Sequence, residues 1–334
     1  MKSFQPLMVR FEHPSGRRFS QASWRSSPRI SYASRVAAVH CAGEKVAVFR
    51  DQSNTAREEM HVGVIGTGER AKPRRAALAG LPPPFVVEHR VPPADPLDDE
   101  GLEATLTGLD VAFIAVAPAE VMRVATAAAR QGLHFFLEWP PAASLREGER
   151  LLKLSEEAGV EVGVSRPWRF HPALAARPAG WKATLAGLTT FFAGEGPAPL
   201  VDAVDLAVTL ARSGTVQRVD AEAVRTGARL DAVAFTLRFH NGAFAQGMVR
   251  RGPGPPALHV FAAGAGHTLE ADLAAPPENA GRAAALEPLP APALLQAESR
   301  AFLDALARRQ PPPVSLLDGL HTLRLLERLM ARLR

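Results

Sequence analysis

The apolar residues between about residue 60 and residue 172 fall into short continuous runs, separated by stretches with helical spacing. The run Val111 to Val116 is apolar without alternation, which is typical of a strand buried on both faces of a parallel sheet. Helices must then connect the strands and cover both faces. The expected strands are His61–Gly66, Phe85–Arg90, Val111–Val116, Leu133–Glu138 and Glu161–Ser165.

After Pro172 the pattern changes to longer strands that alternate apolar and polar positions. Asn241 and Gly242 stand between two such strands and predict a tight hairpin, because both tolerate positive φ. The fold class expected is therefore α/β: a doubly wound Rossmann sheet, then an α+β part with an open, mostly antiparallel sheet. The later strands are 182–192, 216–224, 231–239, 243–250, 258–263 and 267–273, with helices over 294–309 and 315–333.

Three segments follow from this pattern. Residues 1–59 lack a sustained period and predict a disordered or misassigned N-terminal extension. Residues 60–172 are the expected Rossmann domain for NAD(P), and residues 173–334 the expected C-terminal domain, to which the family resemblance described below assigns substrate and subunit contacts.

The net charge of +5 comes from the first segment. Residues 1–59 hold 10 of the 39 basic and 5 of the 34 acidic residues, which leaves 29 of each for the rest. This balance argues against a nucleic-acid partner. A single cysteine, Cys41, allows no internal disulfide and fits the cytoplasm, and no apolar run is long enough to cross a membrane.

The stretch His61 to Ala71 reads H-V-G-V-I-G-T-G-E-R-A, a buried strand that runs into a glycine turn. Gly66, Gly68 and Ala71 occupy the three small positions of G-x-G-x-x-G/A, with Thr67 between the glycines. Small residues permit a tight turn and bring the following helix N-terminus up to a pyrophosphate. The turn predicts a site for NAD or NADP.

The choice between the two dinucleotides depends on the end of the next strand, Glu88-His89-Arg90. An acid there binds the ribose 2′-hydroxyl of NAD, whereas an arginine accommodates the 2′-phosphate of NADP. Arg90 stands at the strand tip and Glu88 on the same face. We expect a slight preference for NADP(H), moderated by Glu88.

Two further motifs carry a family resemblance. Residues 133–140 read L-H-F-F-L-E-W-P and residues 162–172 read V-G-V-S-R-P-W-R-F-H-P. With the glycine turn, Ala117-Pro118 and the closing A-E-S-R-A-F-L-D-A-L, the chain from Met60 onward resembles the Gfo/Idh/MocA oxidoreductases. The resemblance implies NAD or NADP beside Ala117, Pro118, Glu138 and Trp139, a sugar-like or related small substrate, and homo-oligomers through the C-terminal sheet.

The chain departs from the family pattern at both proton-transfer positions. Trp139 replaces the lysine of the Glu-Lys-Pro motif, and Asp202 stands where a histidine is expected. Indole cannot shuttle a proton. Asp202 and Asp205, three apart on one helix, could form an acid/base pair or a solvated edge. His171 could reach the nicotinamide or cap a helix. No cluster has metal-ligand spacing, so no metal is expected.

Two functions stay open. One is an NAD(P)-dependent oxidoreductase with an altered proton relay through Asp202, Asp205 or His171. The other is a sensor or regulatory protein that binds dinucleotide without turnover, because both proton-transfer residues are replaced.

Overall fold

The computed structural model describes residues 59–95, 98–192, 198–227, 229–252, 257–274 and 292–333. The chain divides into Met1–Asn54 and Thr55–Arg334, and every described residue belongs to the second part. The predicted N-terminal extension, up to residue 58, lies outside the described residues.

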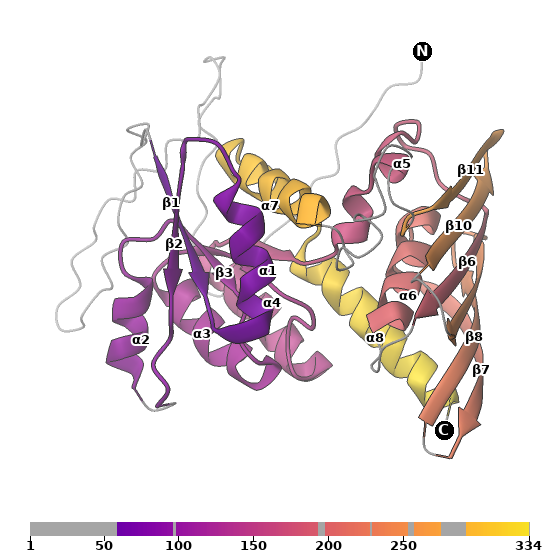
Figure 1. Ribbon diagram of the computed structural model, residues 1–334, viewed down its shortest axis with the longest axis horizontal. Coiled ribbons are helices and arrows are strands. Elements are labelled where there is room, and N and C mark those ends of the chain that lie inside the picture. The colour runs from indigo at the N-terminus through magenta and orange to yellow at the C-terminus, as the bar shows by residue number, and fades with distance from the viewer. Residues whose placement is uncertain are drawn as a thin grey trace, which may run out of the picture. The chain divides into compact units, whose positions relative to one another are not determined.

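The first sheet has five parallel strands in the order β2-β1-β3-β4-β5 (Figure 1). The chain winds from β1 to β2 on one side and then crosses to β3 on the other, so the winding direction switches between β1 and β3. In open α/β sheets this switch point, at the carboxyl ends of the strands, is where ligands bind. The strands are β1 Met60–Ile65, β2 Phe85–Arg90, β3 Val111–Ile114, β4 His134–Leu137 and β5 Val162–Val164. The helices are α1 Gly68–Ala79, α2 Asp99–Leu106, α3 Pro118–Arg130 and α4 Leu145–Ala158.

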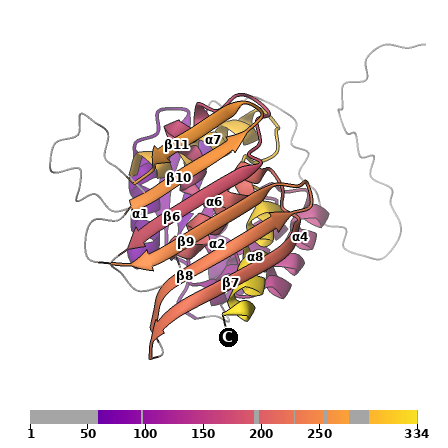
Figure 2. The ribbon, with the colours of Figure 1, turned by 90° about the vertical axis from the view of Figure 1, so that its right-hand side faces the viewer.

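The second sheet has six strands in the order β11-β10-β6-β9-β8-β7 (Figure 2). Only the β6–β9 pair is parallel among these described strands. Gly242, with φ 83°, makes the predicted turn between β8 and β9. The expected fold class is confirmed. These strands are β6 Leu185–Phe192, β7 Val216–Thr226, β8 Arg229–Phe239, β9 Phe244–Arg251, β10 Ala257–Gly264 and β11 His267–Asp272.

The remaining helices connect the two sheets. Apolar side chains of α6 form one core with the inner face of the second sheet. Helix α7 returns to the first sheet, where Phe302 packs edge-on against Phe113 with ring centroids 5.9 Å apart. Because the chain's last helices complete the first core, the domain division at residue 172 stays a prediction. The elements are η1 Pro167–Phe170, α5 Pro172–Ala175, α6 Ala198–Ala211, α7 Pro292–Ala307 and α8 Leu316–Arg332.

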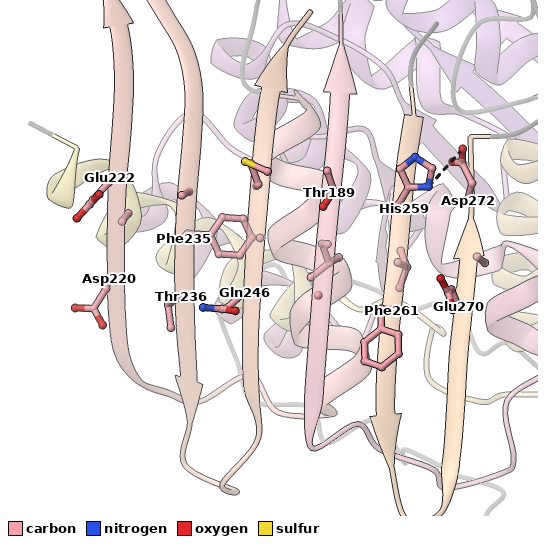
Figure 3. A pocket seen from close by; sticks show the side chains of 18 residues that line it. Thr189, Asp220, Glu222, Phe235, Thr236, Gln246, His259, Phe261, Glu270 and Asp272 are labelled. Carbon is pink, nitrogen blue, oxygen red and sulfur yellow. Dashed lines mark ion pairs between the residues drawn. The ribbon is translucent and has the colours of Figure 1, made fainter.

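The outer face of the second sheet is not covered by any described helix (Figure 2). A hollow of about 890 Å³ lies on it, lined by Thr189, Met248, Phe261 and acidic residues of the two edge strands (Figure 3). Its residues come from the sheet alone, so it is separate from the switch point of the first sheet. None of the helices in the described part of the chain is long and apolar enough to span a membrane.

Candidate functional site

The glycine turn lies at the switch point and has the backbone that a pyrophosphate site requires. Gly66 adopts φ 142°, and a Cβ there would lie 2.4 Å from the carbonyl oxygen of Ala115. Gly68 adopts φ 65° with open space where its Cβ would be. Thr67 is the N-cap of α1, but its side chain makes no capping hydrogen bond. The helix N-terminus therefore faces outward without a side-chain cap, and the turn fits an anionic pyrophosphate.

Ala71, the third small residue of the motif, is buried at 1% exposure. It belongs to the core cluster formed by β1, α1 and β3. A larger side chain would push α1 away from the sheet, as the glycine motif implies.

Arg90 at the tip of β2 is paired with Glu88, the residue that the sequence places on the same face. Its Nε and Nη2 donate to Glu88 Oε2 at 3.0 and 2.8 Å. Its Nη1 donates to the carbonyl oxygens of Thr105 and Thr107 at 2.9 and 2.7 Å. Alternation in the strand places Glu88 and Arg90 on one face, where opposite charges pair. A 2′-phosphate would have to displace these partners.

The ends of β3 and β4 provide the other half of the crevice. Ala117 is the N-cap of α3 and Pro118 its first residue, as is common for proline. Trp139 is the second residue after β4. Arg70, on the first turn of α1, donates from Nη1 to Val116 O at 3.0 Å and from Nη2 to Trp139 O at 3.4 Å. A guanidinium thus lies over these two strand ends.

Glu138 forms an ion pair with a buried arginine, Arg74. Arg74 Nε donates to Glu138 Oε1 at 2.6 Å, and Arg74 Nη2 donates to Glu298 Oε2 at 2.8 Å. Burial alone would lower the pKa of Arg74, but the two carboxylates raise it. Ser165 Oγ also accepts from Nη2 at 3.0 Å, and Ser299 Oγ accepts from Nη1 at 2.7 Å. The motif glutamate is therefore fixed by an ion pair, and its predicted contact with a cofactor stays a prediction.

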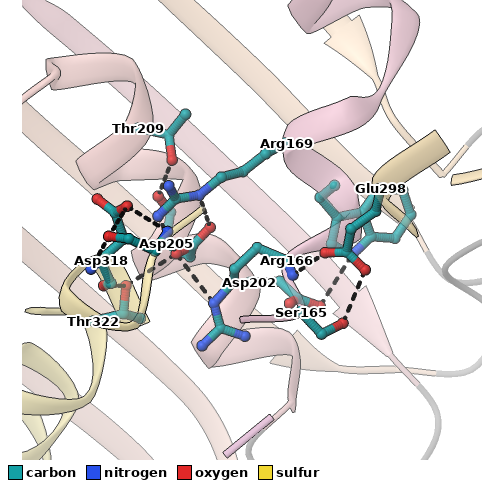
Figure 4. Close-up of polar contacts among 11 residues, drawn as sticks. Ser165, Arg166, Arg169, Asp202, Asp205, Thr209, Glu298, Asp318 and Thr322 are labelled. Carbon is teal, nitrogen blue, oxygen red and sulfur yellow. Dashed lines mark hydrogen bonds and ion pairs between the residues drawn. The ribbon is translucent and has the colours of Figure 1, made fainter. Parts of the chain in front are cut away.

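Asp205 forms the centre of a second charged cluster, drawn in Figure 4. Arg169 binds it with two hydrogen bonds, Nε to Oδ2 at 2.8 Å and Nη2 to Oδ1 at 2.7 Å. Thr322 Oγ1 of α8 donates to Oδ1 at 2.9 Å. Burial would raise the pKa of Asp205, but these donors and the charge of Arg166 lower it. Asp205 is a fully engaged, ionised group.

Asp202, one turn earlier on α6, has a different environment. Trp168 Nε1 donates to its Oδ2 at 3.0 Å. Burial, with a smaller contribution from the charge of Asp205, raises the pKa of Asp202 to about 6, although Arg166 and Trp168 oppose the rise. The two aspartates predicted from sequence thus lie together, and their pKa values are pushed in opposite directions, which is typical of acid/base sites.

Arg166 connects this cluster to Trp139. Its guanidinium carbon lies 3.4 Å from the centroid of the Trp139 ring, a stacked cation–π contact. Its Nε lies 3.1 Å from Asp205 Oδ1, and Nη2 is buried without a hydrogen-bond partner among the described residues. The Arg166 amide donates to Glu298, which joins the two charged clusters. The indole is therefore held flat at the position where the resemblance implies a lysine.

His171 is the N-cap of α5, and its Nδ1 accepts from the Ala173 amide at 3.2 Å. Burial lowers the pKa of His171. This contact is the capping role that the sequence left as an alternative. Neither aspartate of α6 is among its contacts in the described part of the chain.

The structure adds residues that the sequence analysis did not single out: Arg70, Arg74, Arg166, Trp168, Arg169 and Glu298. The S-R-P-W-R-F motif contains Arg166, Trp168 and Arg169. Its two arginines within six residues were the sequence signal that could have indicated a charged site. For Arg74 the only signal was a charged residue on the buried face of α1, and its two glutamates are 64 and 224 residues away. Within the described residues no three acidic, histidine or cysteine side chains form a group that could hold a metal ion.

Comparison with known proteins supports the resemblance. A model of the Gfo/Idh/MocA family, described as an oxidoreductase family with an NAD-binding Rossmann fold, matches residues 89–166. The resemblance inferred from the motifs is confirmed. The glycine turn lies outside the matched range, so its assignment depends on its own geometry. No curated protein matches the chain.

Solved structures share the whole fold. UDP-N-acetylglucosamine 3-dehydrogenase GnnA from Acidithiobacillus ferrooxidans superposes with a TM-score of 0.66 at 19% identity, covering 82% of this chain and 98% of the other. A dehydrogenase from Chromobacterium violaceum gives 0.67 at 18%, covering 83% and 96%. Scyllo-inositol dehydrogenase from Lactobacillus casei, solved with NAD(H) and scyllo-inositol, gives 0.67 at 14%, covering 82% and 97%.

Proposed function

We propose that this protein is an NAD(P)-dependent oxidoreductase that moves hydride to or from a sugar-like or related small substrate, with Asp202 as the acid/base. The observation that carries the proposal is the split of the two aspartates on α6. Asp205 is locked as a carboxylate, whereas Asp202 has a pKa of about 6 and can change protonation near neutral pH. A general acid or base works best with such a pKa.

The residues divide the work. Gly66, Thr67, Gly68 and Ala71 would hold the pyrophosphate, and Ala117, Pro118, Glu138 and Trp139 would line the nicotinamide end. A bound dinucleotide supplies the hydride chemistry. Asp202 would take the hydroxyl proton when an alcohol is oxidised or give it when a carbonyl is reduced. The ion pair between Arg169 and Asp205 positions α6, and the charge of Arg169 keeps Asp205 ionised beside Asp202. His171 caps α5, which leaves it outside this relay.

The dinucleotide is either NAD(H) or NADP(H). Arg90 at the end of β2 could pair with a 2′-phosphate, and its pairing with Glu88 opposes that contact. We therefore propose only a slight preference for NADP(H), moderated by Glu88.

The second candidate function is binding of dinucleotide without turnover. One observation favours it: Trp139 is stacked on Arg166 where the resemblance implies a proton-transferring lysine. Both functions share the cofactor site and differ in whether Asp202 acts.

A single set of measurements separates the two. Dinucleotide absorbance is followed with a panel of polyols and sugars that includes scyllo-inositol and UDP-N-acetylglucosamine, the compounds named for two structural neighbours. Alcohol oxidation should increase as pH rises through about 6, because the base is ionised Asp202, and carbonyl reduction should decrease over the same range. Asp202→Asn should lower kcat roughly 10²-fold to 10⁴-fold and remove this pH limb.

The matched control is Glu156→Gln, an exposed acid on α4. It should change neither kcat nor the pH profile. Dinucleotide binding without turnover of any compound would favour the second function. Failure of wild-type protein to bind either dinucleotide would reject the cofactor site itself.

We also propose that two copies associate through the outer face of the second sheet. Met248 and Phe261 are 45% and 39% exposed there and line the hollow of Figure 3 together with polar residues. Exposed apolar side chains grouped on one uncovered sheet face are typical of an interface.

A further inference from the structure

Within the part of the chain that the structure describes, the side chain of Arg70 is a cation without a carboxylate partner. Its guanidinium donates to the carbonyl oxygens of Val116 and Trp139, at 3.0 and 3.4 Å. Among the described residues no aspartate or glutamate forms an ion pair with it, whereas Arg74, one turn along α1, pairs with Glu138 and Glu298. The charge of Arg70 is thus left uncompensated at the ends of β3 and β4.

The nearest motif acids do not neutralise it. Glu138 is taken by Arg74 at 2.6 Å. Glu120 Oε2 accepts from the Ala117 amide at 3.3 Å and so serves the N-terminus of α3, where a helix dipole already favours negative charge. Arg70 itself is largely exposed toward the crevice.

The position of Arg70 decides which half of a dinucleotide it meets. This step depends on the proposed function. With the pyrophosphate at the N-terminus of α1, the adenosine ribose lies at the end of β2. The nicotinamide half must then extend to the other side of the switch point, over β3 and β4. Arg70 bridges the ends of those two strands.

We infer that Arg70 makes this site bind the reduced dinucleotide in preference to the oxidised one. The oxidised nicotinamide ring carries a positive charge, and the reduced ring is neutral. A guanidinium at the nicotinamide end of the crevice would repel only the oxidised ring, by an amount equivalent to about tenfold in Kd in a partly solvated site.

Calorimetric titration of the full chain with NADH and NAD⁺, and with NADPH and NADP⁺, tests the inference. The readout is the ratio of the oxidised to the reduced Kd, compared between variants. Arg70→Gln should lower this ratio about tenfold, mainly by tightening the oxidised form. Arg70→Lys keeps the charge and should keep the ratio.

Arg75→Gln is the matched control. It removes the same charge from the same helix, but Arg75 contacts His89 beside β2, at the adenosine end shared by both forms. Its ratio should equal that of the wild type. If Arg70→Gln tightens both forms equally, Arg70 only fills space and the inference is overturned. If neither form binds to any variant, the proposed function falls and takes this inference with it.

Discussion

At the scale of single residues, the environment decides what a carboxylate can do. Asp202 and Asp205 have the same side chain and lie three positions apart. Among the described contacts, however, only Asp205 accepts bidentate hydrogen bonds from a guanidinium and a further one from a hydroxyl group. Charge-assisted bonds of this kind favour the ionised form. Asp202 has one indole donor and much burial, so its proton is held more tightly.

This contrast predicts opposite pH dependences of stability. The pKa of Asp202 in the folded protein, about 6, lies above its value of 3.8 in a solvated carboxyl. Ionisation of Asp202 therefore lowers the free energy of unfolding as pH rises from about 4 to about 6. Relative to Asp202→Asn, the wild type should lose at most about 3 kcal/mol of unfolding free energy over this range. Urea unfolding across pH measures the difference.

Asp205→Asn should behave in the reverse sense. The folded pKa of Asp205 is lowered, so its contribution is present at neutral pH and is lost as pH falls through that value. The variant should be less stable at neutral pH, with the gap to wild type closing in acid. Parallel pH curves for the two variants would contradict the assignment.

Arg90 gives a second prediction at this scale. Glu88→Gln removes the charge that holds the guanidinium, while the carbonyl oxygens of Thr105 and Thr107 keep it near the end of β2. The variant should favour NADPH over NADH by about tenfold more than the wild type, because a charge-assisted bond to a phosphate becomes available. Calorimetry with both reduced dinucleotides measures this. An unchanged ratio would mean that the 2′ position lies elsewhere.

At the scale of elements, the strand-turn-helix unit β1–α1 is the part that binds. Its turn glycines, Gly66 and Gly68, have positive φ, and Gly66 closely approaches Ala115 directly after β3. Helix α1 also carries Arg74, whose bonds reach the chain after β4, the chain after β5, and α7. The cofactor helix is therefore tied to the ends of β4 and β5 and to α7.

Gly68→Leu should abolish the thermal shift produced by dinucleotide, because a bulky side chain enters the open space before the helix N-terminus. Gly132→Leu is the matched control. Gly132 also has positive φ, 70°, and open space at its Cβ, but it follows α3 at the opposite ends of the strands. Both variants should lose stability of about 1 kcal/mol or more from backbone strain. Only Gly68→Leu should lose the ligand response; an intact response would reject the site.

At the scale of the whole molecule, helix α8 contributes leucines to the cores of both sheets, and the outer face of the second sheet is not covered by any described helix. Helix α6 covers the inner face of the second sheet and carries Asp202 toward the motif after β5. The outer face carries exposed apolar residues without cover from the described helices.

Phe261→Asp should shift the protein from oligomer to monomer, because it places a charge in the proposed interface. Analytical ultracentrifugation measures the mass. Leu317→Asp, at a position 47% exposed on α8, is the control and should leave the mass unchanged. A monomeric wild type would overturn the proposed interface.

The sequence alone determined the local features. Strand runs such as Val111 to Val116, the Asn241-Gly242 turn and the glycine motif have their causes within a few residues, in burial, positive φ and steric space. The presence of one parallel and one mostly antiparallel sheet followed from the change of pattern after Pro172, whereas the order of the strands came from the structure.

Only the tertiary structure decided which charged side chains pair with one another. Glu88 pairs with Arg90 across one strand face, Asp205 with Arg169 across 36 residues, and Arg74 with Glu298 across 224. Whether a guanidinium is free or occupied depends on which carboxylates the fold brings to it, near or far along the chain, because the strength of an ion pair depends on distance and burial. For this reason the cofactor turn could be located from its own residues, whereas the roles of Asp202, Arg70 and Arg90 could not.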